Sequence, residues 1–423
     1  MNWIKSTLSY TVGTAEPEYG PGAIHPVTDQ AGPAYSVLTK DDLKWKAMQT
    51  TNVETQIFYL FSPRGEVGSV QIIYNNVAWV PFFLLRRCLS PTGCIRSDPS
   101  EQDIAIVIPC TNNNPMKSGL MVTCQLNVKI WNHKDNGKTH LWNSDPLENH
   151  CFTEDMNTLF ADNLSIALNE AGDAYEIKSA RNDEALIDLV VKRTGDGFQV
   201  GNDGTTLYGT DKANPWGEMR HRFWARSDVT GSIRTPEKEY TFGSSDSPGR
   251  GVFIHAIQGM KPHHAAARWN FVTFQTEKYS AIMMEFTTPP SYANTKVNVG
   301  GVVDQQGKIL YAGGDNIIEY LETKEDKETL WPEPASAEYT WKSKDGGFSA
   351  TLKGPLGERQ DRIDVLHHIP GVIKSLVGGV VGTKPYIYQF VEGPKDSLVL
   401  SINNGAQTVE EKGHLLSEAT FIS

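Results

Sequence analysis

Apolar and polar residues alternate along most of the chain from residue 53 onward. Neighbouring side chains on a β-strand point to opposite faces, so this alternation is typical of strands with one buried face. The first run, at 53–61, is followed by a turn signal at Pro63-Arg64-Gly65 and by a return run at 68–74. Later runs lie at 159–169, 175–180, 185–193, 250–258, 266–274, 280–287, 296–303, 308–312, 348–352, 386–391 and 397–402.

Many short strands separated by turn residues predict an all-β fold of antiparallel sandwiches or barrels. Roughly 370 residues of this pattern are too many for one barrel, so we expect two β-barrel domains in tandem. We place their division within a dense aromatic and basic segment at 214–228, which gives an N-terminal domain at 51–225 and a C-terminal domain at 226–423. The Pro- and Gly-rich residues 14–50 are expected to form a connector before them.

The first 13 residues follow a different period. At about 100° per residue, Trp3, Ile4, Leu8 and Val12 share one broad apolar face, which predicts a short amphipathic helix. Such a helix is marginal alone in water, so something must cover that face. Two covers stay open: the body of the protein, or a membrane interface.

Two further segments interrupt the strand pattern. Thr39 is a good helix-capping residue and is followed by two acids, so a second short helix is predicted to begin there. The apolar, Gly-rich segment 366–381 is interpreted as a helix in a barrel mouth, as a lip touching lipid, or as a buried connection.

Composition narrows the function classes. Lys and Arg total 39 against 50 Asp and Glu, a net charge of -11, so we expect no nucleic-acid partner. The chain has no run of about 18 apolar residues and no secretory signal pattern at its start, which makes a cytoplasmic location the default expectation. The five cysteines are an odd number, which argues against a disulfide framework.

Candidate chemistry is sparse, and we find no phosphate-binding loop, nucleophile elbow or zinc motif. We therefore expect no metal, no cofactor and no catalytic residue. One polar cluster combines His263, His264, Arg268 and Trp269, which could present polar groups to a ligand at a barrel mouth. An ion pair of Arg268 and a barrel-floor position for Trp269 are the structural alternatives.

A second cluster lies at the expected division between the domains. Arg220, Arg222 and Trp224 would share one strand face, whereas His221 and Phe223 would share the other. The cluster is either a basic lining for an acidic ligand group or the interface between the domains.

Several long strings resemble the fungal survival-factor family, a family of oxidative-stress survival proteins described as ceramide-binding. They are AEPEYG at 15–20, IHPVTD at 24–29, TNVETQIFY at 51–59, FADNLSIALNE at 160–170, NPWGEMRH at 214–221, PHHAAARWNFVTFQ at 262–275, MMEFTTPPSY at 283–292, NVGG at 298–301 and GTKPYIYQF at 382–390. The resemblance covers nearly the whole chain in order. It implies two tandem lipocalin-like β-barrel domains.

The resemblance also implies a function. A member of this family is expected to bind ceramide or a related sphingolipid and to carry it without vesicles from the endoplasmic reticulum to the Golgi. It is expected to support sphingolipid homeostasis and survival under oxidative stress. The family's membrane-docking helix corresponds to residues 1–13, so Trp3, Ile4, Leu8 and Val12 would contact the membranes of the endoplasmic reticulum and cis-Golgi. A nuclear location is left open. His263, His264, Arg268, Trp269, Arg220 and Trp224 are the candidate lipid-binding residues.

Residues 79–118 depart from the family pattern and hold three of the five cysteines, Cys88, Cys94 and Cys110. They have no recognisable period, and we interpret them as an atypical insertion that originates from a retained intron or a mispredicted exon joint, with a genuine long loop as the alternative. Two other functions stay open for the whole chain. Tandem lipocalin-like domains also resemble hydratases and cyclases of isoprenoid or polyketide metabolism, for which Arg220, His221 and Trp224 would be the candidates. A binding scaffold without a ligand is the third.

Overall fold

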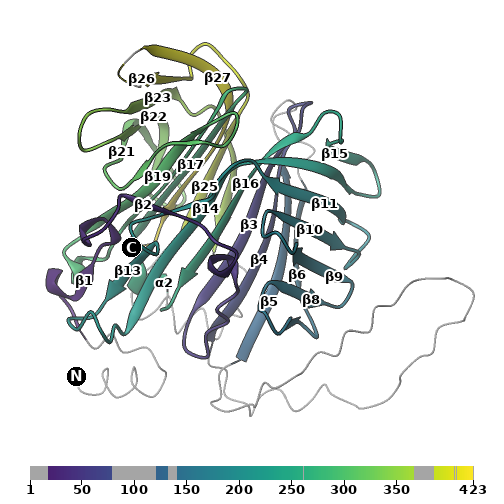
Figure 1. The fold of residues 1–423 in the computed structure, drawn as a ribbon, viewed down its shortest axis with the longest axis horizontal. Coiled ribbons are helices and arrows are strands. Elements are labelled where there is room, and N and C mark those ends of the chain that lie inside the picture. Colours follow the sequence, from purple (N-terminus) through teal and green to yellow (C-terminus); the bar gives the residue numbers. More distant parts are fainter. Residues whose placement is uncertain are drawn as a thin grey trace, which may run out of the picture.

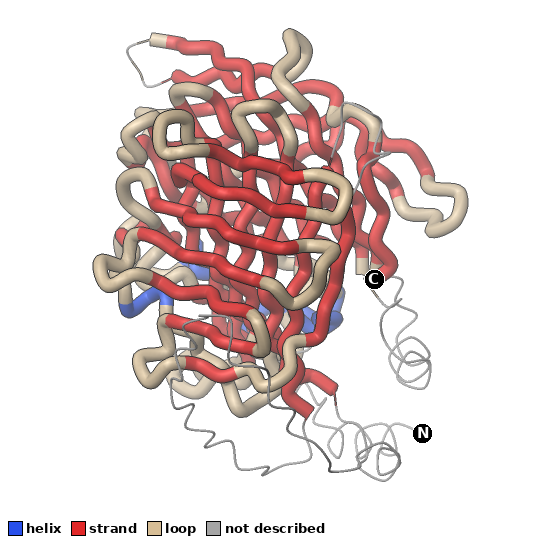
Figure 2. The backbone as a smooth tube through the Cα atoms, turned by 90° about the vertical axis from the view of Figure 1, so that its right-hand side faces the viewer, coloured by secondary structure: helices blue, strands red, loops and turns tan. Residues whose placement is uncertain are grey.

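The computed structural model describes residues 18–78, 121–131, 141–260, 262–365, 385–403, 405 and 407–422. The chain forms two large antiparallel sheets that each curl into a half-barrel and lie side by side (Figures 1 and 2). This confirms the predicted all-β class. No helix among these residues is long and apolar enough to cross a membrane. The predicted N-terminal helix, the insertion at 79–118 and the segment 366–381 lie outside the described residues.

The first half-barrel has 16 strands, in the order β6-β5-β4-β3-β16-β14-β11-β10-β9-β8-β7, with β1, β2, β12, β13 and β15 joined at its sides. Their bounds are β1 Ile24–His25, β2 Tyr35–Val37, β3 Val53–Phe61, β4 Val67–Ala78, β5 Met121–Trp131, β6 Leu141–Pro146, β7 Cys151–Phe152, β8 Thr158–Ala161, β9 Leu164–Leu168, β10 Ala174–Ser179, β11 Leu186–Arg193, β12 Phe198–Val200, β13 Thr205–Tyr208, β14 Gly217–Arg234, β15 Glu239–Gly243 and β16 Gly249–Gln258. The short 3-10 helices η1 Pro21–Ala23, η2 Val27–Asp29 and η3 Asp41–Leu43 lie in the connector.

The second half-barrel has 11 strands, with the main order β20-β19-β18-β17-β27-β26-β23-β22-β21 and with β25 and β24 continuing from β27. Their bounds are β17 Arg268–Thr276, β18 Tyr279–Thr287, β19 Lys296–Asp304, β20 Ile309–Gly313, β21 Ile317–Glu325, β22 Pro332–Lys342, β23 Ser349–Pro355, β24 Arg359–Asp364, β25 Tyr386–Glu392, β26 Val399–Asn403 and β27 Thr408–Phe421. The helix α2 Pro262–Ala265 connects the two sheets, and η6 Pro290–Tyr292 follows β18.

The change from one sheet to the other does not coincide with the predicted division between residues 225 and 226. β14 is one continuous strand of 18 residues that passes through this point and pairs with both β11 and β16. β15 and β16 also belong to the first sheet, so the sheets change between Gln258 and Arg268. The dense aromatic sequence at 214–228 therefore marks a central strand buried on both faces.

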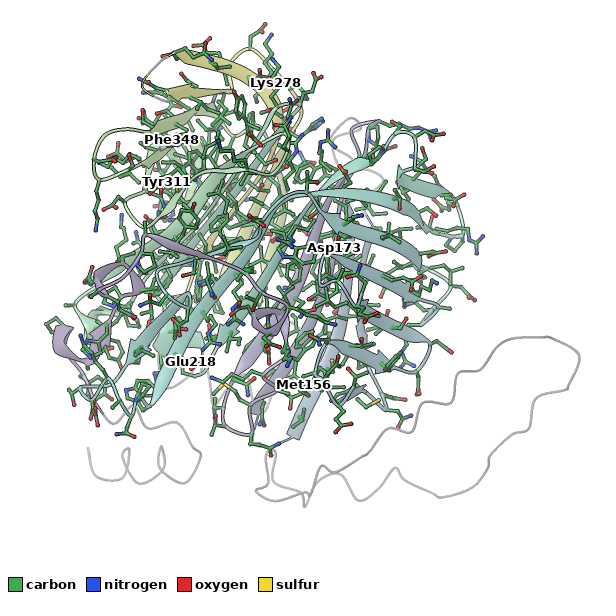
Figure 3. All side chains as sticks on the ribbon, viewed as in Figure 1. Met156, Asp173, Glu218, Lys278, Tyr311 and Phe348 are labelled. Carbon is green, nitrogen blue, oxygen red and sulfur yellow. The ribbon has the colours of Figure 1, made fainter. Side chains whose placement is uncertain are left out.

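Three apolar cores follow from the period of two along the strands. On β3, Phe58 and Leu60 point into the concave side of the first half-barrel, whereas Tyr59 and Phe61 point to the second sheet and form part of an inter-sheet core. The third core fills the concave side of the second half-barrel. Tyr311 and Phe348, labelled in Figure 3, stack there with ring centroids 5.5 Å apart.

The helix predicted from Thr39 is only the single turn η3 (Asp41–Leu43). Within this turn, Asp42 Oδ2 accepts the Thr39 backbone N–H at 2.8 Å and the Thr39 hydroxyl at 2.7 Å. From Lys44 the backbone is extended and Trp45 is buried in the first core, so tertiary packing overrides the local helix signals. We call residues 38–47 the strap, since they cross the concave side of the first half-barrel.

The run at 159–169 is two strands, β8 and β9, because Asn163 turns the chain with a φ of 55°. Cys124 is a buried free thiol, and Cys151 takes part in a disulfide. The cysteine count did not predict that bond, because it depends on which thiols meet in space.

Candidate functional site

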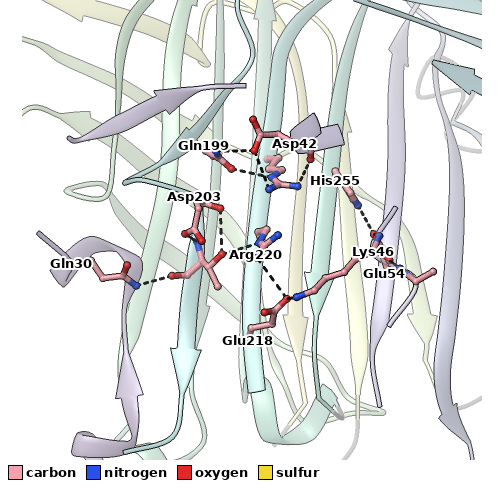
Figure 4. Close-up of polar contacts among 12 residues, drawn as sticks. Gln30, Asp42, Lys46, Glu54, Gln199, Asp203, Glu218, Arg220 and His255 are labelled. Atoms are coloured by element: carbon pink, nitrogen blue, oxygen red, sulfur yellow. Dashed lines mark hydrogen bonds and ion pairs between the residues drawn. The ribbon is translucent and has the colours of Figure 1, made fainter. Parts of the chain in front are cut away.

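A carboxylate and an imidazole lie inside the first half-barrel, where the pattern places apolar side chains. Glu54 on β3 is fully buried and His255 on β16 is 1% exposed. Their Oε1 and Nε2 atoms are 2.8 Å apart (Figure 4). Glu54 lies on the same strand face as Phe58 and Leu60, so the period of two carries it into the core.

The Glu54 carboxylate also holds the strap in place. Oε1 accepts the backbone N–H of Lys46 at 2.8 Å, and Oε2 accepts that of Ala47 at 2.7 Å. The indole of Trp45 packs against the ring of His255, with centroids 5.8 Å apart. A buried charge needs such partners, because desolvation penalises it strongly when it is unpaired.

Arg222 on β14 fastens the other half of the strap. Its guanidinium donates to Gln199 Oε1 at 3.0 Å and to Asp42 Oδ1 at 3.2 Å, and also to the Asp42 backbone carbonyl (Figure 4). Burial lowers the pKa of Arg222 to about 10, which leaves it protonated at neutral pH. Burial opposes ionisation of Asp42, but the hydrogen bonds from Thr39 and the charge of Arg222 outweigh it and lower the pKa of Asp42.

Arg220 and Trp224 share the Arg222 face, as the alternation predicted. Arg220 donates from Nε to Thr205 Oγ1 at 2.8 Å, and its Nη2 lies 3.9 Å from Glu218 Oε1. Trp224 packs in the first core, 4.9 Å from the ring of Phe253. The arginine side chains are thus engaged by neighbouring residues of the protein.

The opposite face of β14 packs against the second sheet. The ring of His221 lies 6.0 Å from that of Trp269 and 6.3 Å from that of Phe286. Burial lowers the pKa of His221 to about 4, so this imidazole is neutral at physiological pH. The face of β14 that carries His221 and Phe223 is therefore part of the interface between the two sheets, which is one of the two interpretations given for this segment.

The cluster predicted around α2 does not converge. Trp269 points into the inter-sheet core, 5.4 Å from Phe286. Arg268, one position earlier, is exposed on the other face of β17 with its guanidinium 5.8 Å from the Phe421 ring. His264 is half-buried in α2, and the side chain of His263 lies outside the description.

A buried charge network, which the sequence did not reveal, joins the two sheets. Lys129 on β5 forms an ion pair with Asp361 on β24 and donates to Gln389 Oε1 at 2.7 Å. Gln389 Nε2 in turn donates to Glu418 Oε1 at 2.6 Å. Burial lowers the pKa of Lys129 and raises that of Glu418, because each charge has lost hydration.

The second half-barrel has its own polar group on the concave side. Glu285 accepts the side-chain amides of Asn270 at 3.2 Å and Asn298 at 3.1 Å. Asn316 donates to Asn298 Oδ1 at 3.0 Å. Within the described part of the chain, no group of three or more His, Cys, Asp or Glu residues is arranged to hold a metal ion.

A comparison with known proteins identifies the family of this chain. The Svf1 family model matches residues 1–82 and 112–423. The chain belongs to the Svf1 family. The unmatched residues 83–111 lie within the stretch interpreted as an atypical insertion. A relative from Emericella nidulans, named ceramide-binding protein svf1, is 47% identical over 428 residues and covers 100% of both chains. Relatives of the corresponding name from Neurospora crassa and Schizosaccharomyces pombe are 43% and 36% identical, each over 100% of this chain and 99% of their own.

Solved structures of similar fold are much more distant in sequence. CghA has a TM-score of 0.54 at 10% identity, covering 92% of this Svf1-family chain and 99% of its own. A putative AttH from Nitrosomonas europaea has a TM-score of 0.53 at 10% identity, covering 94% and 99%. Kievitone hydratase from Nectria haematococca has a TM-score of 0.51 at 11% identity, covering 95% and 98%. These likenesses confirm the tandem lipocalin-like fold.

Proposed function

We propose that this protein is a ceramide carrier that moves ceramide from the endoplasmic reticulum to the Golgi without vesicles. The observation that carries the proposal is full-length similarity to relatives named ceramide-binding protein, at up to 47% identity. The protein would support sphingolipid homeostasis and survival under oxidative stress. It would reside in the cytoplasm and bind peripherally to endoplasmic reticulum and cis-Golgi membranes through residues 1–13.

The physical chemistry of the two half-barrels suits this role. Their concave sides carry apolar side chains, and in the first half-barrel the buried Glu54–His255 pair lies among them. Burying an acyl chain contributes about 0.8 kcal/mol per methylene. A few buried polar groups can then orient the amide and hydroxyls of the lipid.

A transfer assay tests the proposal directly. The full chain is mixed with donor vesicles containing labelled ceramide and with unlabelled acceptor vesicles, and the label is followed over time. We expect transfer to increase with protein concentration, and ceramide to be found by mass spectrometry in the purified protein. A protein that gives no transfer above the spontaneous rate and carries no sphingolipid would contradict the proposal.

The second candidate is a hydratase or cyclase that acts on an apolar isoprenoid or polyketide substrate. The likeness to kievitone hydratase and the buried Glu54–His255 pair favour it, because such a pair can move a proton in an apolar site. The test is incubation with apolar fungal extracts, followed by mass spectrometry for products that have gained or lost water. Turnover that is lost in His255→Gln would support the enzyme over the carrier.

A further inference from the structure

Three buried polar atoms, where the strap meets β3 and β16, have no hydrogen-bond partner among the described residues. They are the indole Nε1 of Trp45, the amide Oε1 of Gln56 and the imidazole Nδ1 of His255. The three residues are 2%, 0% and 1% exposed. An unpaired buried polar group costs about 1–3 kcal/mol, so three of them in one place call for a ligand that pairs with them.

The three residues are neighbours in the core of the first half-barrel. Gln56 on β3 lies directly opposite His255 on β16 in the antiparallel register. The ring of Trp45 packs on that of His255, with centroids 5.8 Å apart. Phe58 and Phe253, two residues further along the same strands, lie beside them as an apolar wall.

The hydrogen-bonding character of each atom follows from its neighbours. His255 Nε2 faces the Glu54 carboxylate, which only accepts, so Nε2 carries a hydrogen, and in the neutral tautomer with that hydrogen Nδ1 is an acceptor. Gln56 Nε2 donates to the Leu43 carbonyl at 3.3 Å, which orients Oε1 as the second acceptor. The Trp45 indole can only donate. The three atoms therefore offer two acceptors and one donor.

The geometry points to a head-group subsite formed by Trp45, Gln56 and His255, which binds the secondary amide and a hydroxyl of an N-acylated lipid. This inference rests on the proposed function and specifies its ligand chemistry. The amide N–H and a hydroxyl would donate to Gln56 Oε1 and His255 Nδ1, and the amide carbonyl would accept from Trp45 Nε1. Trp45 belongs to the strap, and the Leu43 carbonyl of the strap accepts from Gln56, so the strap has to move when a lipid is loaded.

The arrangement predicts selectivity between lipids of similar hydrophobicity. A diacylglycerol presents two ester carbonyls and one hydroxyl, so it can satisfy only one of the two acceptors. The other acceptor would then stay buried without a hydrogen-bond donor. A site that hydrogen-bonds its ligand strongly rejects analogues that leave one of its buried polar groups unpaired. We therefore expect a preference for N-acyl lipids over diester lipids.

The experiment compares two fluorescent probes that differ only in the group on the amide nitrogen, which is a hydrogen in one and a methyl in the other. One is a sphingosine N-acylated with a labelled hexanoyl chain, and the other is its N-methyl derivative, which has lost the amide N–H. The wild-type full chain should bind the first about 5-fold more tightly. In the near-isosteric variant Gln56→Met, the acceptor is absent, so the ratio of the affinities for the two probes should fall to about 1.

Two further variants make the result specific. Asn316→Leu is the matched control, since Asn316 is a 7% exposed amide of the second half-barrel whose Oδ1 also has no partner among the described residues. It should keep the wild-type preference. Trp45→Phe removes the donor and keeps an aromatic ring, so it should weaken both probes by a similar factor and provides a test if Gln56→Met folds poorly.

The outcomes separate this inference from the proposed function. Equal binding of both probes by the wild-type chain, or an unchanged preference in folded Gln56→Met, would overturn the subsite while ceramide binding stands. Loss of the preference in Asn316→Leu alone would move the subsite to the second half-barrel and overturn this assignment. A wild-type chain that binds neither probe would refute the ceramide carrier itself.

Discussion

The Lys129 network makes a quantitative prediction about how the two half-barrels hold together. Lys129 is 2% exposed at the side chain, and its ammonium pairs with Asp361 and with Gln389 of the second sheet. The substitution Lys129→Met keeps the length of the side chain and removes the charge. It leaves the buried Glu418 without its compensating cation.

The magnitude follows from the burial of each partner. Removing one member of a fully buried ion pair costs about 3–5 kcal/mol. The Asp361 side chain is 33% exposed, and water partly screens it, so we expect the lower end, about 3 kcal/mol. Combining the change with Glu418→Gln should recover part of that loss, because the uncompensated carboxylate is then gone.

The assay is urea unfolding of the full chain followed by tryptophan fluorescence. Lys278→Met is the matched control, because Lys278 is 56% exposed and forms a 2.8 Å ion pair with Glu411 (Lys278 is labelled in Figure 3). Its loss should destabilise the protein far less than the loss of Lys129. If Lys129→Met destabilises no more than this control, the network does not hold the sheets together and the reasoning fails.

Three more predictions concern the rest of the chain. Burial raises the pKa of Glu418 in the folded state, so the protonated carboxyl contributes to stability below its unfolded pKa, and this contribution is lost as the pH rises through the folded pKa. Glu418→Gln should therefore raise the melting temperature at about pH 8 and should no longer do so near pH 4. The opposite trend would contradict the assignment. Leu8→Asp should reduce binding to liposomes about 10-fold or more without changing the unfolding curve, and unchanged sedimentation with the liposomes would remove residues 1–13 from membrane docking. Sequencing the transcript across codons 79–118 should show a major species without this stretch, whereas in-frame reads containing it would establish a genuine loop.

The polar residues inside the cores carried a signal that sequence reasoning did not use. In the run VETQIFYLF, Glu54 and Gln56 are in phase with the buried Phe58 and Leu60. Likewise, His255 is in phase with Phe253. A charged or amide residue in phase with core positions is expensive to bury, so such positions deserve a functional interpretation before adjacent histidine pairs do.

The sequence by itself determined the strands, since the period of two reports directly which residues alternate between faces. It also determined the family, because long matching strings run along the whole chain. What it could not determine is which distant residues meet. Glu54 and His255 are 201 positions apart, and Lys129 and Asp361 are 232 apart.

Only the tertiary structure showed how the strap is folded and which residues the two faces of β14 contact. Local signals at Thr39 indicated a helix, but burial of Trp45 and the hydrogen bonds from Lys46 and Ala47 to Glu54 favour an extended chain. The turn η3 just before it places Asp42 over β14, where it binds Arg222. Local propensities amount to fractions of a kcal/mol per residue, whereas burying an aromatic side chain contributes several times more, so the packing of the whole sheet determines where such a segment lies.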